Sequence, residues 1–332
     1  MKTILRTFVG CTAILFGTAC MGAVKYVPEN MKVELSLKVP GNNAVNYKLH
    51  PDKLENSYFD YEWRSDNKLP ITVFHKVEER DSCMRLTVQL TAAQDVYFNY
   101  RQLLSTGYRH DNCQFYMPGF WYRRNLRSPK KAPSFHTSDS WLVREDRLSA
   151  PLTGIFSEKE KRFMTVNRLD DFSMDALATH KEGEIILSGK TSLGFTGFEN
   201  QQGIAMLSFG FPYREAPKSY IRKLTLAPEV EAFQLMKKGE SVLLTWEIME
   251  SGADDFSDFI QHTWEHCYDT YAPKPVENSY SIADMKQVLS CFFVNSLVDN
   301  QPLVYNSGIH LKVSDCERNG QAEVGFIGRV LL

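Results

Sequence analysis

The residues best suited to bind a ligand lie together in one stretch, from Gln114 to Pro129. Aromatic rings stack on the apolar faces of sugars, and arginine can pair with a carboxylate through two N–H groups. The stretch therefore predicts a site for a sugar that carries an acid group, formed by five consecutive residues: Trp121, Tyr122, Arg123, Arg124 and Asn125. The alternative is a strand whose aromatic rings belong to the core and whose arginines face solvent.

Two further polar stretches are candidates for chemistry. Glu199 and Asn200 lie in a glycine-bracketed segment that indicates an exposed binding loop. Asp315 and Glu323 lie in a polar stretch just before a predicted helix, where carboxylates could supply acid/base catalysis on a glycosidic bond. A solvated loop with acidic residues at a helix start explains the second stretch equally well.

The chain begins with a segment typical of a secretory signal peptide. Lys2 and Arg6 precede a short apolar run, and small residues follow at positions 17–20. The run is much shorter than the roughly 20 residues of a membrane span. We therefore expect an exported protein, in the periplasm or as an outer-membrane lipoprotein. Two interpretations of the cleavage site remain: acylation of Cys20 as a lipid anchor, or ordinary cleavage after Ala19 or Ala23.

Composition excludes several classes of protein. The formal net charge is −2 and no sustained basic run is present, so we expect no nucleic-acid partner. The seven cysteines show no CxxC spacing and no histidines at a repeated ligand spacing, which argues against a zinc site; we expect neither metal nor cofactor. One disulfide, such as Cys83–Cys113, and buried free thiols are both compatible with the sequence. GxSxG, Walker, HExxH and GxGxxG motifs are absent.

The elements that must position these residues are mostly strands. From residue 24 to about residue 250 apolar and polar residues alternate with a period of two, as in Met31–Val39, Met84–Leu90 and Val242–Ile248. Many short strands without intervening helices predict a mainly β fold, a large antiparallel β-sandwich of about a dozen strands or more.

The period changes after residue 250. Residues 251–280 predict a helix, with apolar residues such as Phe256 and Phe259 at helical spacing, followed by a Pro-rich linker. A second helix is predicted from Ser281, with Asp284 at a capping-box position. Residues 321–332 indicate a third. The predicted order is a signal peptide (1–23), a sandwich (24–250), the helix and linker (251–280) and an incomplete helical domain (281–332), with a short helical cap as the alternative.

This order resembles secreted polysaccharide-processing enzymes of Bacteroides-like bacteria. The resemblance rests on the stretch Pro118–Pro129, the Pro-bounded linker, and the segments 305–309 and 323–329. In those enzymes a β-sandwich precedes an (α/α) toroid of the six-hairpin glycosidase type, which generally holds the acid/base carboxylates. The resemblance implies the N-terminal part of a glycoside hydrolase or related enzyme, with a poly- or oligosaccharide, particularly a uronic-acid glycan, as its partner. A non-catalytic carbohydrate-binding or envelope structural protein is the alternative hypothesis.

Overall fold

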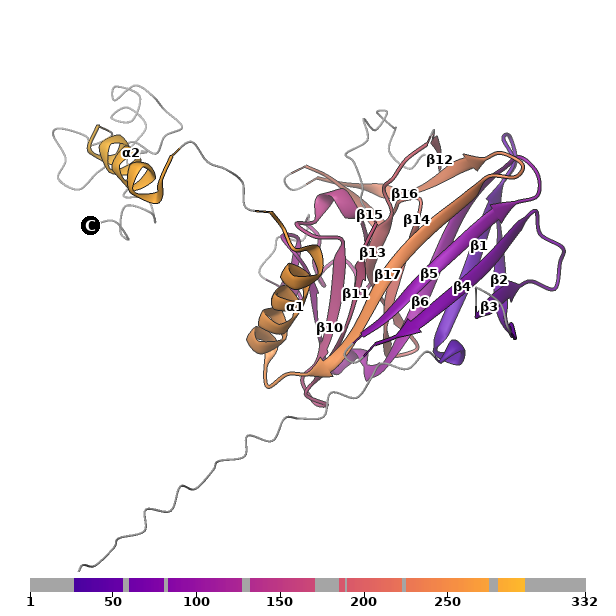
Figure 1. The fold of residues 1–332 in the computed structure, drawn as a ribbon, viewed down its shortest axis with the longest axis horizontal. Helices are drawn as coiled ribbons and strands as arrows, with labels where there is room; N and C mark the ends of the chain where they lie inside the picture. Colours follow the sequence, from indigo (N-terminus) through magenta and orange to yellow (C-terminus); the bar gives the residue numbers. More distant parts are fainter. Residues whose placement is uncertain are drawn as a thin grey trace, which may run out of the picture. The chain divides into compact units, whose positions relative to one another are not determined.

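The computed structural model describes residues 27–55, 60–80, 83–126, 132–170, 185–188, 190–222, 225–274 and 280–295. The chain divides into two compact units, with the boundary after Tyr271. The expected signal peptide and Cys20 lie outside the described residues, as do Asp315, Glu323 and the predicted third helix. The described part of the first unit is mainly β, which confirms the predicted class (Figure 1).

The first unit contains seventeen described strands and a helix. The strands are β1 (Met31–Lys38), β2 (Val45–Lys53), β3 (Tyr61–Arg64), β4 (Ile71–Glu79), β5 (Cys83–Ala92), β6 (Val96–Arg109), β7 (Cys113–Met117), β8 (Trp121–Arg123), β9 (Trp141–Arg144), β10 (Leu152–Ser157), β11 (Arg162–Arg168), β12 (Ile185–Ser188), β13 (Phe195–Gln201), β14 (Ile204–Phe211), β15 (Arg214–Arg222), β16 (Thr225–Met236) and β17 (Ser241–Gly252). Of three short 3-10 helices, Pro28–Asn30 precedes β1, whereas His110–Asn112 and Glu145–Arg147 follow β6 and β9.

Nine strands pair in a continuous antiparallel series. Its order is β2–β3–β4–β5–β17–β11–β10–β7–β8. β2 also pairs with β1, and β1 pairs with β6, so β2 joins this series to the remaining strands. The series brings β7 and β8, which hold the aromatic-arginine stretch, next to β10 through the register Gly154↔Tyr116 and Ser157↔Cys113.

The remaining strands are arranged in a more complex way than the alternating period predicts. β6, β14, β13, β9, β15 and β16 form a closed ring of hydrogen-bonded strands. Closure is feasible because β6 is long: its first residues pair with β16, and its later residues pair with β14 along the same edge. β12 adds to β16 as a parallel strand, whereas the expectation was purely antiparallel.

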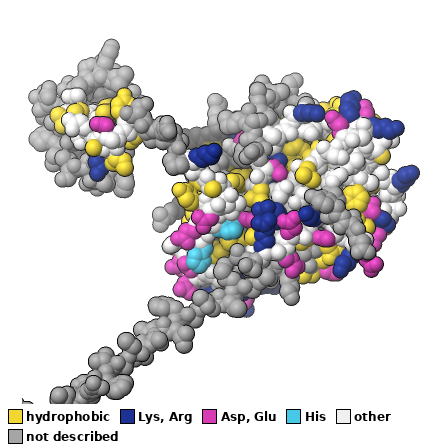
Figure 2. All heavy atoms as spheres, viewed as in Figure 1, with side chains coloured by type: hydrophobic (Ala, Val, Ile, Leu, Met, Phe, Trp, Pro, Cys, Tyr) yellow, Lys and Arg dark blue, Asp and Glu magenta, His cyan; other side chains and the backbone are white. Residues whose placement is uncertain are grey.

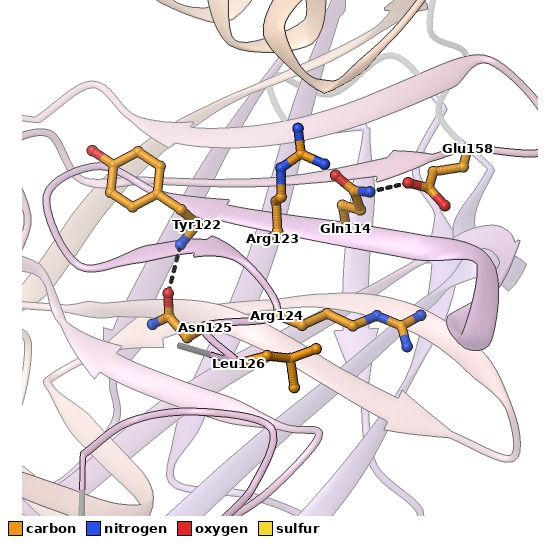
Figure 3. A pocket seen from close by; sticks show the side chains of 7 residues that line it. All are labelled: Gln114, Tyr122, Arg123, Arg124, Asn125, Leu126 and Glu158. Atoms are coloured by element: carbon orange, nitrogen blue, oxygen red, sulfur yellow. Dashed lines mark hydrogen bonds between the residues drawn. The ribbon is translucent and has the colours of Figure 1, made fainter. Parts of the chain in front are cut away.

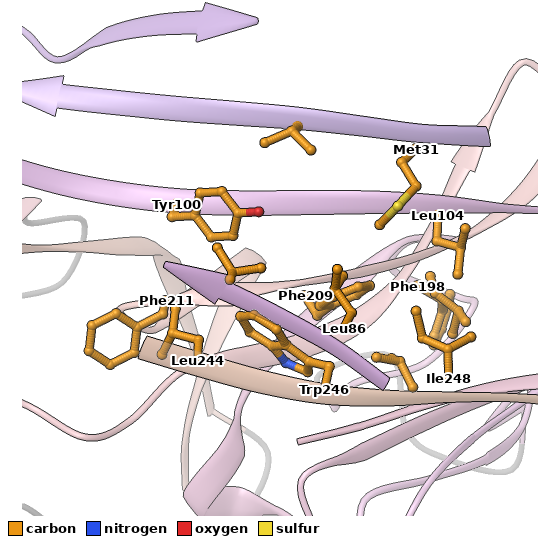
Figure 4. Packing of buried hydrophobic residues seen from close by; sticks show 14 of the residues in the cluster. Met31, Leu86, Tyr100, Leu104, Phe198, Phe209, Phe211, Leu244, Trp246 and Ile248 are labelled. Carbon is orange, nitrogen blue, oxygen red and sulfur yellow. The ribbon is translucent and has the colours of Figure 1, made fainter. Parts of the chain in front are cut away.

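The main core lies between the two groups of strands. Phe209 on β14 contacts Trp246 on β17 with ring centroids 5.2 Å apart, and Leu86, Phe198 and Ile248 belong to the same cluster (Figure 4). Each large side chain that is fully buried contributes about 1.5–3 kcal/mol relative to an exposed position. The alternation seen in β1, β5 and β17 therefore has its expected cause, one apolar face of the strand turned to this core.

Helix α1 (Phe256–Tyr271) belongs to the first unit and packs on the opposite face of the nine-strand series. Asp255 accepts hydrogen bonds from the Ser257 and Asp258 amides at 2.7 and 2.9 Å, which caps the helix N-terminus. Phe259 packs so closely on β10 that a Cβ at Gly154 would lie 2.5 Å from its ring. Only glycine permits that approach.

Helix α2 (Ile282–Asn295) is the described element of the second unit. Ser281 Oγ bonds the Asp284 carboxylate at 2.6 Å and accepts from the Asp284 amide at 3.1 Å, which confirms the predicted cap. Neither described helix is long and apolar enough to cross a membrane. The cysteines at 83, 113 and 267 are buried free thiols, and Cys291 is an exposed one, so Cys83 and Cys113 are not joined.

Candidate functional site

The aromatic-arginine stretch forms a hairpin and a tight turn at its end. Gly119 has φ +77° in the connection from β7 to β8, and Arg123 and Asn125 have φ of 59° and 49°. The Asn125 side chain secures the turn, because its Oδ1 accepts from the Tyr122 amide at 3.1 Å and its Nδ2 donates to the Phe120 and Pro133 carbonyls at 3.2 Å. Asparagine tolerates the left-handed region better than most residues, which suits it to this position.

This turn forms one wall of an open pocket of about 730 Å³. We call it the turn pocket; its lining residues are Gln114, Tyr122, Arg123, Arg124, Asn125, Leu126 and Glu158 (Figure 3). Its volume lies within the range of about 300–1,000 Å³ that is usual for small-molecule sites. Four of the five residues predicted as substrate-binding in this stretch therefore line a single hollow.

Tyr122 and Arg123 are among the exposed residues of the lining. The Tyr122 ring is 49% exposed, and its hydroxyl accepts a hydrogen bond from the Gly119 amide at 3.3 Å. The Arg123 guanidinium lies over the Phe256 ring of α1, 4.9 Å from its centroid. Among the described residues it forms no ion pair with a carboxylate. An aromatic face and a cation with donors to spare are thus presented side by side.

Arg124 is held more firmly. It donates to the carbonyls of Asp111 and Cys113, the second at 3.4 Å, and its guanidinium lies 5.4 Å from the centroid of Phe135. Opposite it, Gln114 donates to Glu158. Arg124 therefore contributes a positioned positive charge, and part of its hydrogen-bonding capacity is already used by the fold.

Trp121 has a different position from the one the sequence predicted. Its ring is 0% exposed and packs against Trp141 and Phe198, with centroids 5.8 and 5.1 Å away. Its indole N–H donates to the Arg123 carbonyl at 2.9 Å. Alternation along β8 points this ring into the core, so Trp121 cannot stack on a sugar and instead supports the turn beneath the pocket.

Glu199 and Asn200 lie away from the turn pocket. Glu199 forms an ion pair with Arg101, which also bonds Glu34 at 3.0 Å. Asn200 donates to Asp139 at 2.7 Å and accepts from the Gly203 amide at 2.9 Å, so it closes the turn from β13 to β14. The predicted exposed loop is in fact the end of a strand pair.

Glu199 nevertheless borders a second, smaller hollow. This hollow of about 160 Å³ lies over the ring of strands and is lined in part by Arg101, Trp141, Arg214 and Glu229. Burial raises the pKa of the nearby Glu231 carboxyl. The Arg214 guanidinium, 3.8 Å from that carboxylate, acts in the opposite direction and lowers the pKa. Because the charges here are largely paired with one another, we consider the turn pocket the stronger candidate site.

Sequence reasoning missed Glu158 as a lining residue of the turn pocket. Glu158 follows β10, more than thirty residues from the hairpin, and it reaches the pocket only because β10 pairs with β7. No local pattern indicates that pairing. The predicted catalytic residues Asp315 and Glu323 lie outside the described residues, so the structure does not place them beside either hollow.

Comparison with known proteins finds weak structural similarity only. No family model and no curated protein matches the chain. Among solved structures, a polysaccharide lyase is similar over 70% of this chain and 27% of its own, with a TM-score of 0.32 and 14% identity. The Slr1438 protein from Synechocystis is similar over 65% of this chain and 73% of its own, with a TM-score of 0.33 and 8% identity.

A third solved structure is a family 36 α-galactosidase from Geobacillus stearothermophilus, in complex with stachyose. It is similar over 66% of this chain and 30% of its own, with a TM-score of 0.28 and 10% identity. The chain thus spans less than a third of the length of this enzyme and of the polysaccharide lyase. What the chain itself does must be argued from its residues.

Proposed function

We propose that this chain is the N-terminal part of an exported glycoside hydrolase or related polysaccharide-degrading enzyme that acts on acidic glycans. In this proposal the β unit is a sandwich that precedes an (α/α) toroid, and the turn pocket forms one wall of the substrate cleft. The observation that carries it is the turn pocket, where the exposed Tyr122 ring lies beside Arg123 and Arg124.

The chemistry of these groups matches a uronic-acid residue. The Tyr122 ring offers an apolar face to the C–H face of a sugar, and the ring loses little conformational entropy on binding. Arg123 has N–H donors available for a carboxylate, and a charge-assisted pair of this kind is about twice as strong as a neutral hydrogen bond. Arg124 adds positive charge at a fixed position.

The catalytic part of the proposal rests on residues beyond the β unit. Asp315 and Glu323 are the carboxylates that we nominate for acid/base catalysis, in a helical domain that begins with α2. The predicted signal peptide implies export. Cys20 is then either acylated or close to the cleavage site. Metabolic labelling with a fatty-acid analogue separates these two outcomes, because only an acylated chain takes up the label.

Binding is tested by titrating a uronic-acid oligosaccharide into the recombinant chain. Tyr122→Ala and Arg123→Ala should each weaken binding by about tenfold, equivalent to about 1.4 kcal/mol. Matched controls are Tyr268→Ala and Arg64→Ala, since Tyr268 is exposed and Arg64 forms exposed ion pairs, both outside the pocket. A carboxyl-reduced oligosaccharide should bind more weakly to the unchanged chain. Arg123→Ala should not weaken the binding of this neutral oligosaccharide further.

Equal binding by the variants and the unchanged chain would remove the turn pocket from the site. Catalysis is tested separately, by comparing this chain with a longer product of the same gene. Glycan cleavage that is lost in Asp315→Asn or Glu323→Gln supports the enzyme. Tight binding without cleavage by any product supports the non-catalytic carbohydrate-binding alternative.

A further inference from the structure

A second cluster of chemically reactive side chains lies where α1 crosses the nine-strand series. Cys83 on β5, Glu247 on β17 and His266 on α1 each place one donor atom within 4.8 Å of the other two. Cys83 and Glu247 are buried, whereas the His266 side chain is 24% exposed. Figure 2 shows histidine side chains next to acidic ones over the position that α1 occupies in Figure 1.

The strand register explains how the three residues meet. Met249 is the register partner of Cys83, and Glu247 that of Arg85, so Cys83 and Glu247 lie two positions apart on one face of paired strands. α1 packs on that face through Phe259 and Cys267, which turns His266 toward the sheet. The group is therefore held by the packing of a helix on a sheet and not by a local sequence motif.

The three side chains already interact through Glu247. His266 Nε2 lies 2.6 Å from Glu247 Oε1, and Thr270 donates to the same oxygen at 3.4 Å. Arg85 lies 3.8 Å from the other carboxylate oxygen. Burial opposes ionisation of Glu247, but the hydrogen bond from His266 and the neighbouring charges leave its pKa below the usual value. Glu247 is thus an anion held in place beside a thiol and an imidazole.

We propose that Cys83, Glu247 and His266 form a binding site for a thiophilic divalent cation, with Zn²⁺ as the best match. Thiolate, imidazole and carboxylate are the three ligand types that zinc binds, at about 2.0–2.3 Å. Donor atoms already within 4.8 Å need only small rotamer shifts to reach one ion. The thiolate and the carboxylate together balance its charge, and a fourth position remains for water on the exposed side of His266.

Binding is balanced by the release of one proton. Burial, with Glu247 as a second contribution, raises the pKa of the Cys83 thiol to about 11, so the metal-free site carries a protonated thiol. The cation takes a sulfur lone pair and the S–H proton leaves to solvent. The proton on His266 Nε2 moves to Nδ1, so that Nε2 and the Glu247 carboxylate each bind the metal in place of their hydrogen bond. Affinity should therefore rise with pH.

A bound ion in this site links α1 to the sheet, and we call this link the clamp. Two ligands come from adjacent strands and the third from the last half of the helix, so a bound ion links elements distant in sequence. The clamp is independent of the carbohydrate proposal. It would, however, stiffen the same helix whose Phe256 lies under Arg123 in the turn pocket.

The test is a Zn²⁺ titration of the full chain by calorimetry after treatment with a chelator, followed by Co²⁺ substitution. We expect one Zn²⁺ per chain, higher thermal stability, and a thiolate-to-cobalt charge-transfer band. Cys83→Ser should abolish the band. His266→Gln should weaken Zn²⁺ binding by at least about 100-fold, more than substitution of a residue that only supports a metal ligand usually does.

Matched controls are Cys113→Ser and His262→Gln. Cys113 is a buried thiol on another strand, and His262 lies on α1 one turn before His266. Both controls should keep the band and the affinity of the unchanged chain. Because His266 is partly exposed, its variant should fold, which far-UV circular dichroism checks. A stoichiometry near zero, or a band that persists in Cys83→Ser, overturns the proposal.

Discussion

The turn pocket and the end of β13 contain similar residue types but differ in what those residues already contact. At β13, Glu199 is paired with Arg101, and both ends of the Asn200 amide are bonded within the protein. At the turn pocket, Tyr122 is half exposed, and the Arg123 guanidinium lies over the Phe256 ring without an ion pair to a carboxylate of the described residues. A polar cluster can bind a ligand only through hydrogen-bond donors and aromatic faces that other protein groups do not already occupy.

The largest expected effect separates two neighbouring residues of the turn. Trp121→Ala removes a fully buried ring and should lower the free energy of unfolding by about 3–5 kcal/mol. Tyr122→Ala removes an exposed ring and should change it by less than about 0.5 kcal/mol. Denaturant unfolding of both variants measures the difference. Equal losses of unfolding free energy would contradict the assignment of Trp121 to the core and Tyr122 to the surface.

Acidification should produce the next largest effect, and it defines the pH range in which glycan binding can be compared. His75 is buried beside the Tyr100 hydroxyl at 2.7 Å, and burial lowers its pKa from 6.5 to about 3. Between these values the unfolded chain binds more protons than the folded one, so stability falls as the pH falls.

The slope from His75 should reach about 1.4 kcal/mol per pH unit within that window. Unfolding measurements between pH 4 and pH 7 on the unchanged chain and on His75→Gln test it. The variant should lose this contribution to the slope. An unchanged slope in the variant would show that other groups dominate the acid sensitivity.

A smaller effect tests the paired cluster at β13. Arg101→Met leaves Glu34 and Glu199 without their shared partner in a largely buried position. We expect a loss of about 1–3 kcal/mol in unfolding free energy, because unpaired buried polar groups carry a desolvation penalty. Binding of a uronic-acid oligosaccharide should not change. Weaker binding in this variant, at unchanged secondary structure, would transfer the candidate site to the smaller hollow.

The smallest expected change in stability isolates the role of Arg123. This residue has φ 59°, which costs a side chain roughly 1 kcal/mol and which glycine adopts freely. Arg123→Gly should therefore keep the unfolding free energy within about 0.5 kcal/mol while glycan binding weakens. A large loss of stability would show that its contact with Phe256 supports the fold more than the pocket.

Local patterns predicted the elements of this fold better than their assembly. Period-two alternation predicted β1, β5 and β17, and helical spacing predicted α1, because each pattern reports which face of one element is buried. The ring of strands depends on β6 pairing with both β14 and β16. No segment by itself encodes that pairing, and the parallel partner of β12 was missed for the same reason.

The candidate site was predictable to a similar degree. Residue types singled out Tyr122 and Arg123, which line a surface hollow, but Trp121 in the same stretch is a core residue, which only the direction of β8 decides. Glu158 and the group of Cys83, Glu247 and His266 come together through strand pairing and helix packing. A search for closely spaced ligands therefore could not have found them.

The last residue of α1 fixes the end of the β unit. The Tyr271 hydroxyl lies 2.7 Å from both Asn167 Oδ1 and the Arg168 carbonyl oxygen and shares its one proton with them, so the end of the helix is fixed to the sheet. Ala272 then adopts φ 41°, and Pro273 and Pro275 follow. The β unit thus ends at a helix terminus that is bonded to β11. A chain shortened to residue 272 keeps both of these contacts.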